Sequence, residues 1–225
     1  MPFVLLSVIL VAIVAIVGIY SSMSPPKKPP EYTGQRPEPA DDGYVSNQEV
    51  ALIDAPHDKF YTWINQVDLQ DIMEGRDDFP RTVRTEPIRG SFELGQDRTG
   101  ARRRVVLENG HYVAEEVLVD TPKVFRYMVW GFTSFQRLAI NHAIGEFVYK
   151  DMGDRTQLTW TYSFKPTSVI FRPIVARFVK DTWKPYMQDI LKAMREGYVH
   201  HVGDASAPLT PDSRDRIEGV SGILP

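Results

Sequence analysis

Residues 101–131 read ARRRVVLENGHYVAEEVLVDTPKVFRYMVWG, in which three apolar-rich segments are separated by two short turn signals. Asn109-Gly110 is the strongest local signal for a two-residue hairpin turn, and Thr121-Pro122 marks a second reversal of the chain. Strands joined by turns this short must be antiparallel neighbours in a sheet. The stretch therefore predicts three consecutive antiparallel strands, at about 101–108, 111–120 and 123–131.

The sequence on either side predicts more elements of the same domain. We expect further strands at about 44–53, 81–89, 139–150 and 156–165, and short helices at 57–64 and 69–74. Apolar residues recur at spacings of three and four from about Ser168 to Tyr198, which is typical of a helix with one buried face. Pro185 cannot donate a backbone hydrogen bond inside this helix, so we expect a kink near Asp181.

A strand, two short helices, six strands and a long helix together resemble the START-like (SRPBCC) superfamily, of the polyketide cyclase/dehydrase and lipid-transport type. The segments closest to that pattern are Ile53-Asp-Ala-Pro56, EEVLVDTP at 115–122 and TQLTWTYSF at 156–164. The resemblance implies an α+β helix-grip fold, in which a curved antiparallel sheet of about seven strands wraps around the long C-terminal helix. It implies binding of a sterol, lipid, polyketide, hormone or quinone, or an adaptor role, with no catalytic residues common to the family.

Composition excludes several other classes of protein. The chain has 225 residues, with 26 Lys+Arg, 29 Asp+Glu and no Cys. The absence of Cys excludes a disulfide scaffold, a thiolate metal site and a Cys nucleophile. Basic and acidic residues are equally numerous between residues 44 and 200, so the domain lacks the basic excess of a nucleic-acid-binding protein.

The N-terminus predicts a membrane segment. Residues 3–20 carry no charge and would form a helix of about 27 Å, close to the hydrocarbon thickness of a bilayer. We expect a transmembrane anchor; the alternative is a cleaved signal peptide, although the basic start and the A-x-A cleavage pattern are missing. Lys27, Lys28 and Arg36 follow the run and no basic residue precedes it, which favours a cytoplasmic domain over a periplasmic or extracellular one.

Four parts therefore make up the predicted chain. Residues 3–20 form the anchor, and residues 21–43 form a Pro-rich, extended linker. Residues 44–201 form the START-like domain, and the Gly-, Pro- and Ser-containing residues 202–225 form a disordered tail.

Strand pairing across the two turns predicts a polar group inside the sheet. Two-residue turns would pair Leu107 with Tyr112, Arg103 with Glu116, and Glu116 with Tyr127. Alternation then assigns these residues to the more apolar, inner face of the sheet. The candidate residues for binding the polar end of a hydrophobic molecule are accordingly Arg103, Glu116, Tyr127 and Tyr112. The alternative is a cross-strand salt bridge with no other contact.

Aromatic side chains extend the predicted site. A turn at Gly153-Asp154 would pair Phe147 with Trp160 and Gly145 with Tyr162. Phe147, Trp160 and Tyr162 then line the same cavity or simply pack on the long helix.

No metal or cofactor site is predicted. His142 and Glu146 lie four residues apart, but no third ligand stands at a suitable spacing. Three functions remain open at this point. The first is membrane-tethered binding or transport of a lipid or other hydrophobic small molecule. The second is a cyclase or dehydratase, with Glu116 as acid/base and Tyr127 or Arg103 polarising a carbonyl. The third is a membrane-tethered adaptor for a protein partner.

Overall fold

The computed structural model describes residues 24–37, 40, 42–93 and 95–206. Its helical elements are α2 (His57–Ile64), α3 (Leu69–Ile72), η1 (Phe135–Leu138), η2 (Val169–Phe171), α4 (Arg172–Phe178), the π-helix η3 (Val179–Trp183) and α5 (Lys184–Ser206). The strands are β1 (Val45–Ile53), β2 (Thr82–Arg89), β3 (Arg102–Leu107), β4 (Tyr112–Asp120), β5 (Val124–Trp130), β6 (Ile140–Asp151) and β7 (Thr156–Pro166). Each predicted strand agrees with an observed one to within one residue at either end.

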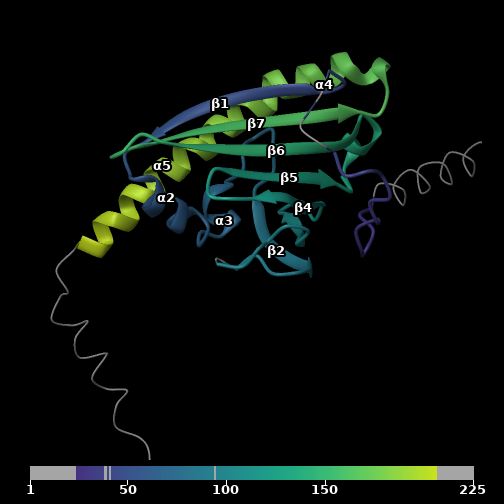
Figure 1. Cartoon of the computed structure of the whole chain (residues 1–225). Helices are drawn as coiled ribbons and strands as arrows, with labels where there is room; N and C mark the ends of the chain where they lie inside the picture. The colour runs from purple at the N-terminus through teal and green to yellow at the C-terminus, as the bar shows by residue number, and fades with distance from the viewer. Residues whose placement is uncertain (1–23, 38–39, 41, 94, 207–225) are drawn as a thin grey trace, which may run out of the picture.

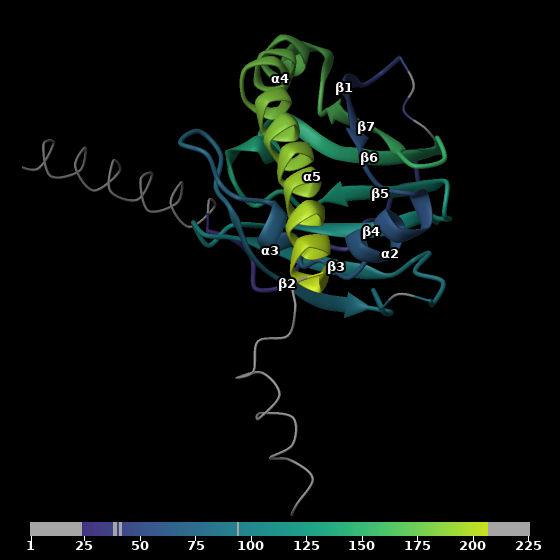
Figure 2. The same ribbon diagram turned by 90° about the vertical axis from the view of Figure 1, so that its left-hand side faces the viewer.

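The strands form one curved sheet that wraps around the C-terminal helix. Within the described part of the chain, seven strands pair antiparallel in the order β1-β7-β6-β5-β4-β3-β2. Figures 1 and 2 show α5 lying across one face of this sheet, with α2 and α3 beside it. The predicted helix-grip fold is therefore confirmed.

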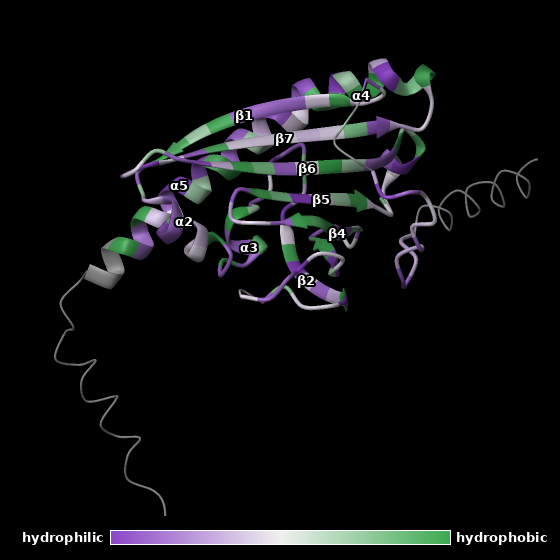
Figure 3. Cartoon of the chain, viewed as in Figure 1, coloured by the Kyte–Doolittle hydropathy of each residue, from purple (hydrophilic) through white to green (hydrophobic). Residues whose placement is uncertain are grey.

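Period-two patterning explains which face the helix covers. Hydrophobic and hydrophilic residues follow one another along β5 and β6 (Figure 3), so that one side of the sheet is suited to burial. Aromatic side chains of β6 and β7 form the centre of the contact. Phe147 stacks on Trp160 with ring centroids 4.9 Å apart, and Tyr162 packs against Trp183 of η3 at 4.5 Å. Such pairs add about 0.5–1.5 kcal/mol each beyond the area they bury.

The irregularity predicted near Asp181 takes the form of a π-helical turn. Residues Val179–Trp183 form this turn between α4 and α5, directly before Pro185. Because Pro185 has no backbone N–H, the carbonyl four residues earlier loses its usual helical partner. The wider turn is one way for the chain to accommodate that loss while keeping Val179 and Trp183 buried.

Residues 26–36, which we call the N-terminal strap, lie against the outer face of the sheet. Trp130 Nε1 donates to the carbonyl of Pro30 at 2.8 Å, and Tyr112 Oη donates to the carbonyl of Pro26 at 2.7 Å. The strap has no helix or strand, as expected for its Pro content. It also packs on the domain, a contact that the prediction of an extended, Pro-rich linker did not include.

An ionic cluster fixes the strap to the sheet. Glu116 of β4 accepts hydrogen bonds from Arg102 of β3 at 2.6 Å and from Arg36 of the strap at 2.9 Å, and Arg102 also contacts Glu31 at 3.0 Å. Burial by itself raises the pKa of the Glu116 carboxyl, but the hydrogen bonds from Arg36 and Arg102 outweigh burial and lower that pKa. Glu116 therefore stays ionised at neutral pH.

The predicted ends of the chain lie largely outside the described residues. Residues 3–20, the predicted anchor, are among those not described. Among the residues that are, no helix is both long and apolar enough to cross a bilayer. The helix α5 continues past the predicted domain end at 201 to Ser206, and the tail from 207 to 225 is not described.

His142 should make the stability of this fold depend on pH. Its Nε2 lies 2.7 Å from the hydroxyl of Tyr44, and burial, with Lys165 nearby, lowers its pKa below the ordinary value of 6.5. The folded protein then binds this proton more weakly than the unfolded chain does. The contribution of the neutral His142 side chain to the free energy of unfolding is fully present above about pH 6.5. It is lost as the pH falls towards the lowered pKa of the folded state.

Urea unfolding at pH 7.5 and at pH 5.5 measures this effect. The free energy of unfolding of the wild-type protein should fall more between the two values than that of His142→Gln. His200→Gln, at an exposed position of α5, should behave like the wild type. An equal loss in all three proteins would contradict the assignment to His142.

Candidate functional site

The pairing of β3 with β4 differs by one residue from the prediction. Arg103 pairs with Glu115, and Val106 pairs with Tyr112. The turn has three residues, because Leu107 N donates to the carbonyl of His111 at 2.8 Å, and Gly110 adopts φ +81°. A type I turn followed by a left-handed glycine closes such a loop, whereas the two-residue turn inferred from Asn109-Gly110 would not.

The pairing of β4 with β5 also differs from the prediction. Thr121 and Val124 close the turn by backbone hydrogen bonds of 2.9 and 3.3 Å, so its two central residues are Pro122 and Lys123. A register shift between Val117 and Val119 adds one unpaired residue to β4. Tyr127 consequently pairs with Val117 and not with Glu116.

Adjacent glutamates on β4 lie on opposite faces of the sheet, and these shifts decide which of them faces inwards. Glu115 lies on the inner face, where it accepts a hydrogen bond from Arg103 Nε at 2.7 Å. Glu116 lies on the outer face beneath the N-terminal strap. The predicted row of Arg103, Glu116 and Tyr127 is therefore wrong in its middle member, because a one-residue slip exchanges the two faces of a strand.

The other predicted residues are placed as follows. Phe147 pairs with Trp160 and Gly145 pairs with Tyr162, so the pairing predicted for β6 and β7 is confirmed. Tyr112 borders the inner cavity, but its hydroxyl is bonded to the strap on the outer side. Arg103, Tyr127, Phe147, Trp160 and Tyr162 all line the cavity.

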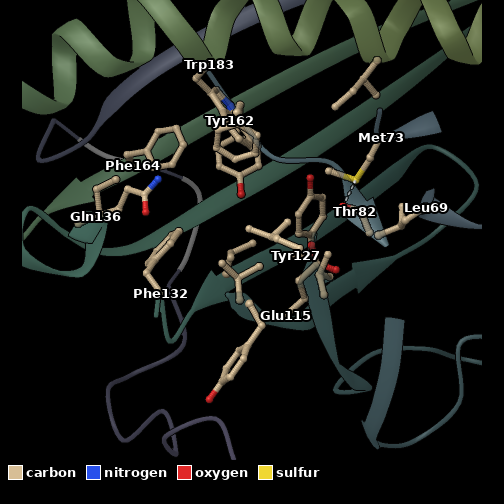
Figure 4. Close-up of a pocket in the computed structure, with 18 of the residues that line it drawn as sticks. Leu69, Met73, Thr82, Glu115, Tyr127, Phe132, Gln136, Tyr162, Phe164 and Trp183 are labelled. Carbon is tan, nitrogen blue, oxygen red and sulfur yellow. Dashed lines mark hydrogen bonds between the residues drawn. The ribbon is translucent and has the colours of Figure 1, made fainter. Parts of the chain in front are cut away.

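A cavity of about 130 Å³ lies between the concave face of the sheet and the helical layer. Most of its lining is apolar. The lining includes Ile72, Met73, Phe79, Val105, Val113, Phe125, Val129, Phe164, Ile190 and Met194. Figure 4 shows side chains of α3, the sheet and η3 converging on it, including those of Leu69, Tyr127, Tyr162 and Trp183.

A few polar groups reach this apolar space. They include the Arg103–Glu115 ion pair and the hydroxyls of Tyr127 and Tyr162, which come from four strands, β3, β4, β5 and β7. The indole Nε1 atoms of Trp160 and Trp183 are buried without a hydrogen-bond partner among the described residues. Trp160 Nε1 approaches the Tyr127 hydroxyl, but the two groups do not make a hydrogen bond of normal geometry.

Burial keeps the phenols of the cavity protonated. It raises the pKa of Tyr127 and of Tyr162, and the negative charge of Glu115 raises both further. Both hydroxyls therefore remain able to donate a hydrogen bond at neutral pH. With the guanidinium of Arg103, they supply hydrogen-bond donors to the cavity wall.

A hollow of about 470 Å³ at the surface adjoins the cavity. The linings of the two spaces share Phe79, Leu107, His111, Ser134, Gln136 and Phe178, and we call this boundary between them the mouth. The rim of the outer hollow is polar and includes Arg76, Asp78 and Glu108.

No metal site is found in the described part of the chain, where no cluster of three potential ligands occurs. His142 contacts Tyr44 and Asn141, and Glu146 pairs with Arg126 Nε at 2.6 Å. The two residues whose spacing invited a metal interpretation thus have other partners.

Solved structures share this fold at low sequence identity. Ara h 8.0201 matches at 15% identity over 70% of this chain and 99% of that chain, with a TM-score of 0.51. The Zhui aromatase/cyclase from a Streptomyces species matches at 15% identity, over 73% and 99% of the two chains, with a TM-score of 0.55. Norcoclaurine synthase from Thalictrum flavum, in complex with dopamine and hydroxybenzaldehyde, matches at 14% identity over 75% and 98%, with a TM-score of 0.52.

No family model matches the sequence, and no curated protein matches it either. The protein shares the helix-grip fold with these solved structures, and the likeness establishes the fold alone.

Glu115 is the site residue that the sequence interpretation missed. Alternation along β4 always required that one of the two adjacent glutamates face inwards, and the turn length decided which one. The chemistry predicted for the site, a buried arginine–carboxylate pair near a phenol, is present with Glu115 in place of Glu116.

Gly145 should be needed for the position of Tyr127. A Cβ atom at residue 145 would lie 2.2 Å from Cζ of Tyr127 and 2.5 Å from its hydroxyl oxygen. We expect Gly145→Ala to destabilise the protein by about 1–3 kcal/mol in urea unfolding, because the ring must move within a packed wall.

A double-mutant cycle separates this clash from other effects of the substitution. In a Tyr127→Leu background the ring is gone, so Gly145→Ala should cost much less. An equal cost in both backgrounds would show that the ring does not occupy the space above Gly145.

Proposed function

We propose that this protein binds a hydrophobic small molecule with one polar end in the cavity between the sheet and α5. The observation that carries the proposal is the combination of an apolar cavity with a buried ion pair and two protonated phenols. A cavity of this kind buries the body of a ligand while a few polar groups fix its orientation.

Cavity size limits the part of a ligand that fits. The volume of about 130 Å³ is near the ~150 Å³ of an engineered cavity that binds benzene, and well below the ~300 Å³ at which drug-sized sites begin. We therefore expect a single ring, or one end of a longer molecule whose remainder leaves through the mouth at Phe79 and Phe178. A whole lipid would require the cavity to widen.

The polar groups favour an acceptor on the ligand. The hydroxyls of Tyr127 and Tyr162 can donate, and the guanidinium of Arg103, which also lines the cavity, can only donate. A carbonyl or ether oxygen placed beside these groups would accept their hydrogen bonds. Such an acceptor distinguishes the expected ligand from a plain hydrocarbon.

Tethering to a membrane belongs to the same proposal. The uncharged run at residues 3–20 supports an anchor, and the basic residues Lys27, Lys28 and Arg36 support a cytoplasmic domain. A tether would raise the local concentration of membrane-derived ligands at the cavity.

An enzymatic role is the second candidate, and one observation favours it. The carboxylate of Glu115 lies in the cavity wall near Tyr127, where an acid/base group and a donor to a carbonyl would be required. In this alternative Glu115 replaces Glu116 as the acid/base. Turnover would then depend on the Glu115 carboxylate, whereas simple binding would not.

Filling the cavity should abolish binding. Val113 lies in β4 and lines the cavity, so Val113→Phe should occupy the space that a one-ring ligand needs. With acetophenone as the probe and tryptophan fluorescence as the readout, we expect at least a tenfold loss of affinity relative to the wild type. Val50→Phe, at a 57% exposed position of β1, is the matched control and should bind as the wild type does.

Two results would count against the proposal. Unchanged affinity in Val113→Phe would place the probe elsewhere. If the wild type bound neither acetophenone nor any of a panel of similar one-ring ketones, the result would contradict the proposal that the cavity binds such a molecule.

A further inference from the structure

Four large apolar side chains are exposed together at one end of the molecule, and we call them the apolar tip. Leu138, Val169, Ile170 and Ile174 have exposed fractions of 66%, 80%, 78% and 60%. Thr167 joins their two segments, because its backbone N donates to the carbonyl of Ala139 at 2.9 Å and its hydroxyl donates to that of Leu138 at 2.7 Å. Such a group of exposed aliphatic side chains is unfavourable in water unless another apolar phase covers it.

The apolar tip is flanked by positive charge. The sequence from 156 to 180 contains Lys165, Arg172, Arg177 and Lys180 and no acidic residue. Arg172 is exposed between Ile170 and Ile174, Lys180 is exposed in the following turn η3, and Arg177 forms an exposed pair with Asp181 at 3.3 Å. Aliphatic side chains surrounded by basic ones suit the boundary of an anionic bilayer, where both are accommodated.

The apolar tip also borders the mouth of the cavity. Gln136 of η1 and Phe178 of α4 line the mouth, and they lie in the same two elements as Leu138 and Ile174. Asp77 and Asp78, which also line the outer hollow, belong to a different segment, the loop before β2, where Asp78 pairs with Arg76 at 3.2 Å. A membrane that covered the tip would therefore lie next to the mouth, on the side whose residues are uncharged or basic.

The path of the chain brings the same end close to a membrane. Figure 1 shows the N-terminal strap and the free end of α4 at one end of the molecule, to the right of the view. Five residues lie between the end of the uncharged run 3–20 and Pro26. The six residue steps from position 20 to position 26 span at most about 22 Å, so a bilayer holding that run would lie near this end of the domain.

We propose that the apolar tip inserts into the interface of an anionic lipid bilayer, with the cavity mouth beside the lipid surface. The contact itself requires no ligand in the cavity. Its consequence, the entry of a hydrophobic ligand directly from the bilayer, rests on the function proposed above.

A single label on the full-length chain tests the contact. The sequence has no Cys, so Ile170→Cys can be labelled selectively with an environment-sensitive fluorophore. The protein is reconstituted in vesicles of phosphatidylcholine with phosphatidylserine, and quenching by doxyl-labelled lipid is measured. Met152→Cys is the matched control, because Met152 is 47% exposed and directly follows β6, about 40 Å along the strand from Ile140 at its other end.

The proposal expects several-fold stronger quenching at residue 170 than at residue 152. Omitting phosphatidylserine, or introducing Arg172→Glu with Lys180→Glu, should weaken the quenching at residue 170, whereas Lys150→Glu with Lys192→Glu should not. Equal quenching at both labels would overturn the insertion. Quenching that is unaffected by phosphatidylserine and by charge reversal would overturn the anionic character of the surface.

Failure of this proposal is distinguishable from failure of the proposed function. Acetophenone binding measured in solution, without vesicles, reports on the cavity alone. Ile170→Glu should retain that binding at wild-type affinity while its membrane contact is lost.

Discussion

The register between β3 and β4 decides what each face of the sheet can do. Two adjacent arginines meet two adjacent glutamates, and alternation sends one pair to each side. Arg103 and Glu115 form an ion pair on the wall of the cavity, while Arg102 and Glu116 join Arg36 beneath the N-terminal strap. Because breaking a buried ion pair leaves an uncompensated charge, both pairs oppose a slip of the strands.

The inner and outer faces of the sheet have different roles. On the inner face, the aromatic side chains of β6 and β7 pack on η3 and α5, and the absence of a side chain at Gly145 leaves room for Tyr127. The result is a small apolar cavity with a few hydrogen-bond donors. On the outer face, Trp130 and Tyr112 hold the strap by its proline carbonyls, which joins the domain to the chain that precedes it.

Much of the fold was predictable from the sequence, because hydrophobic periodicity and turn residues act locally. The strand ends, the short helices and the disturbance before Pro185 all follow from such signals. The turn lengths did not, since Asn109-Gly110 suits both a two-residue and a three-residue loop, and the choice between them exchanges Glu115 with Glu116 at the site. The docking of the strap depends on long-range contacts, such as Arg36 with Glu116, for which a Pro-rich segment gives no local signal.

The central claim is that a small hydrophobic molecule with a polar end occupies the cavity. Methyl-labelled NMR spectra recorded during titration with acetophenone test this most directly, because methyl groups report contact residue by residue. The methyl resonances of Met73, Ile190 and Met194, which line the cavity, should shift together and saturate, while those of the exposed Val50 and Ile88 should stay in place. Shifts confined to surface methyls, or none at saturating probe, would contradict the claim.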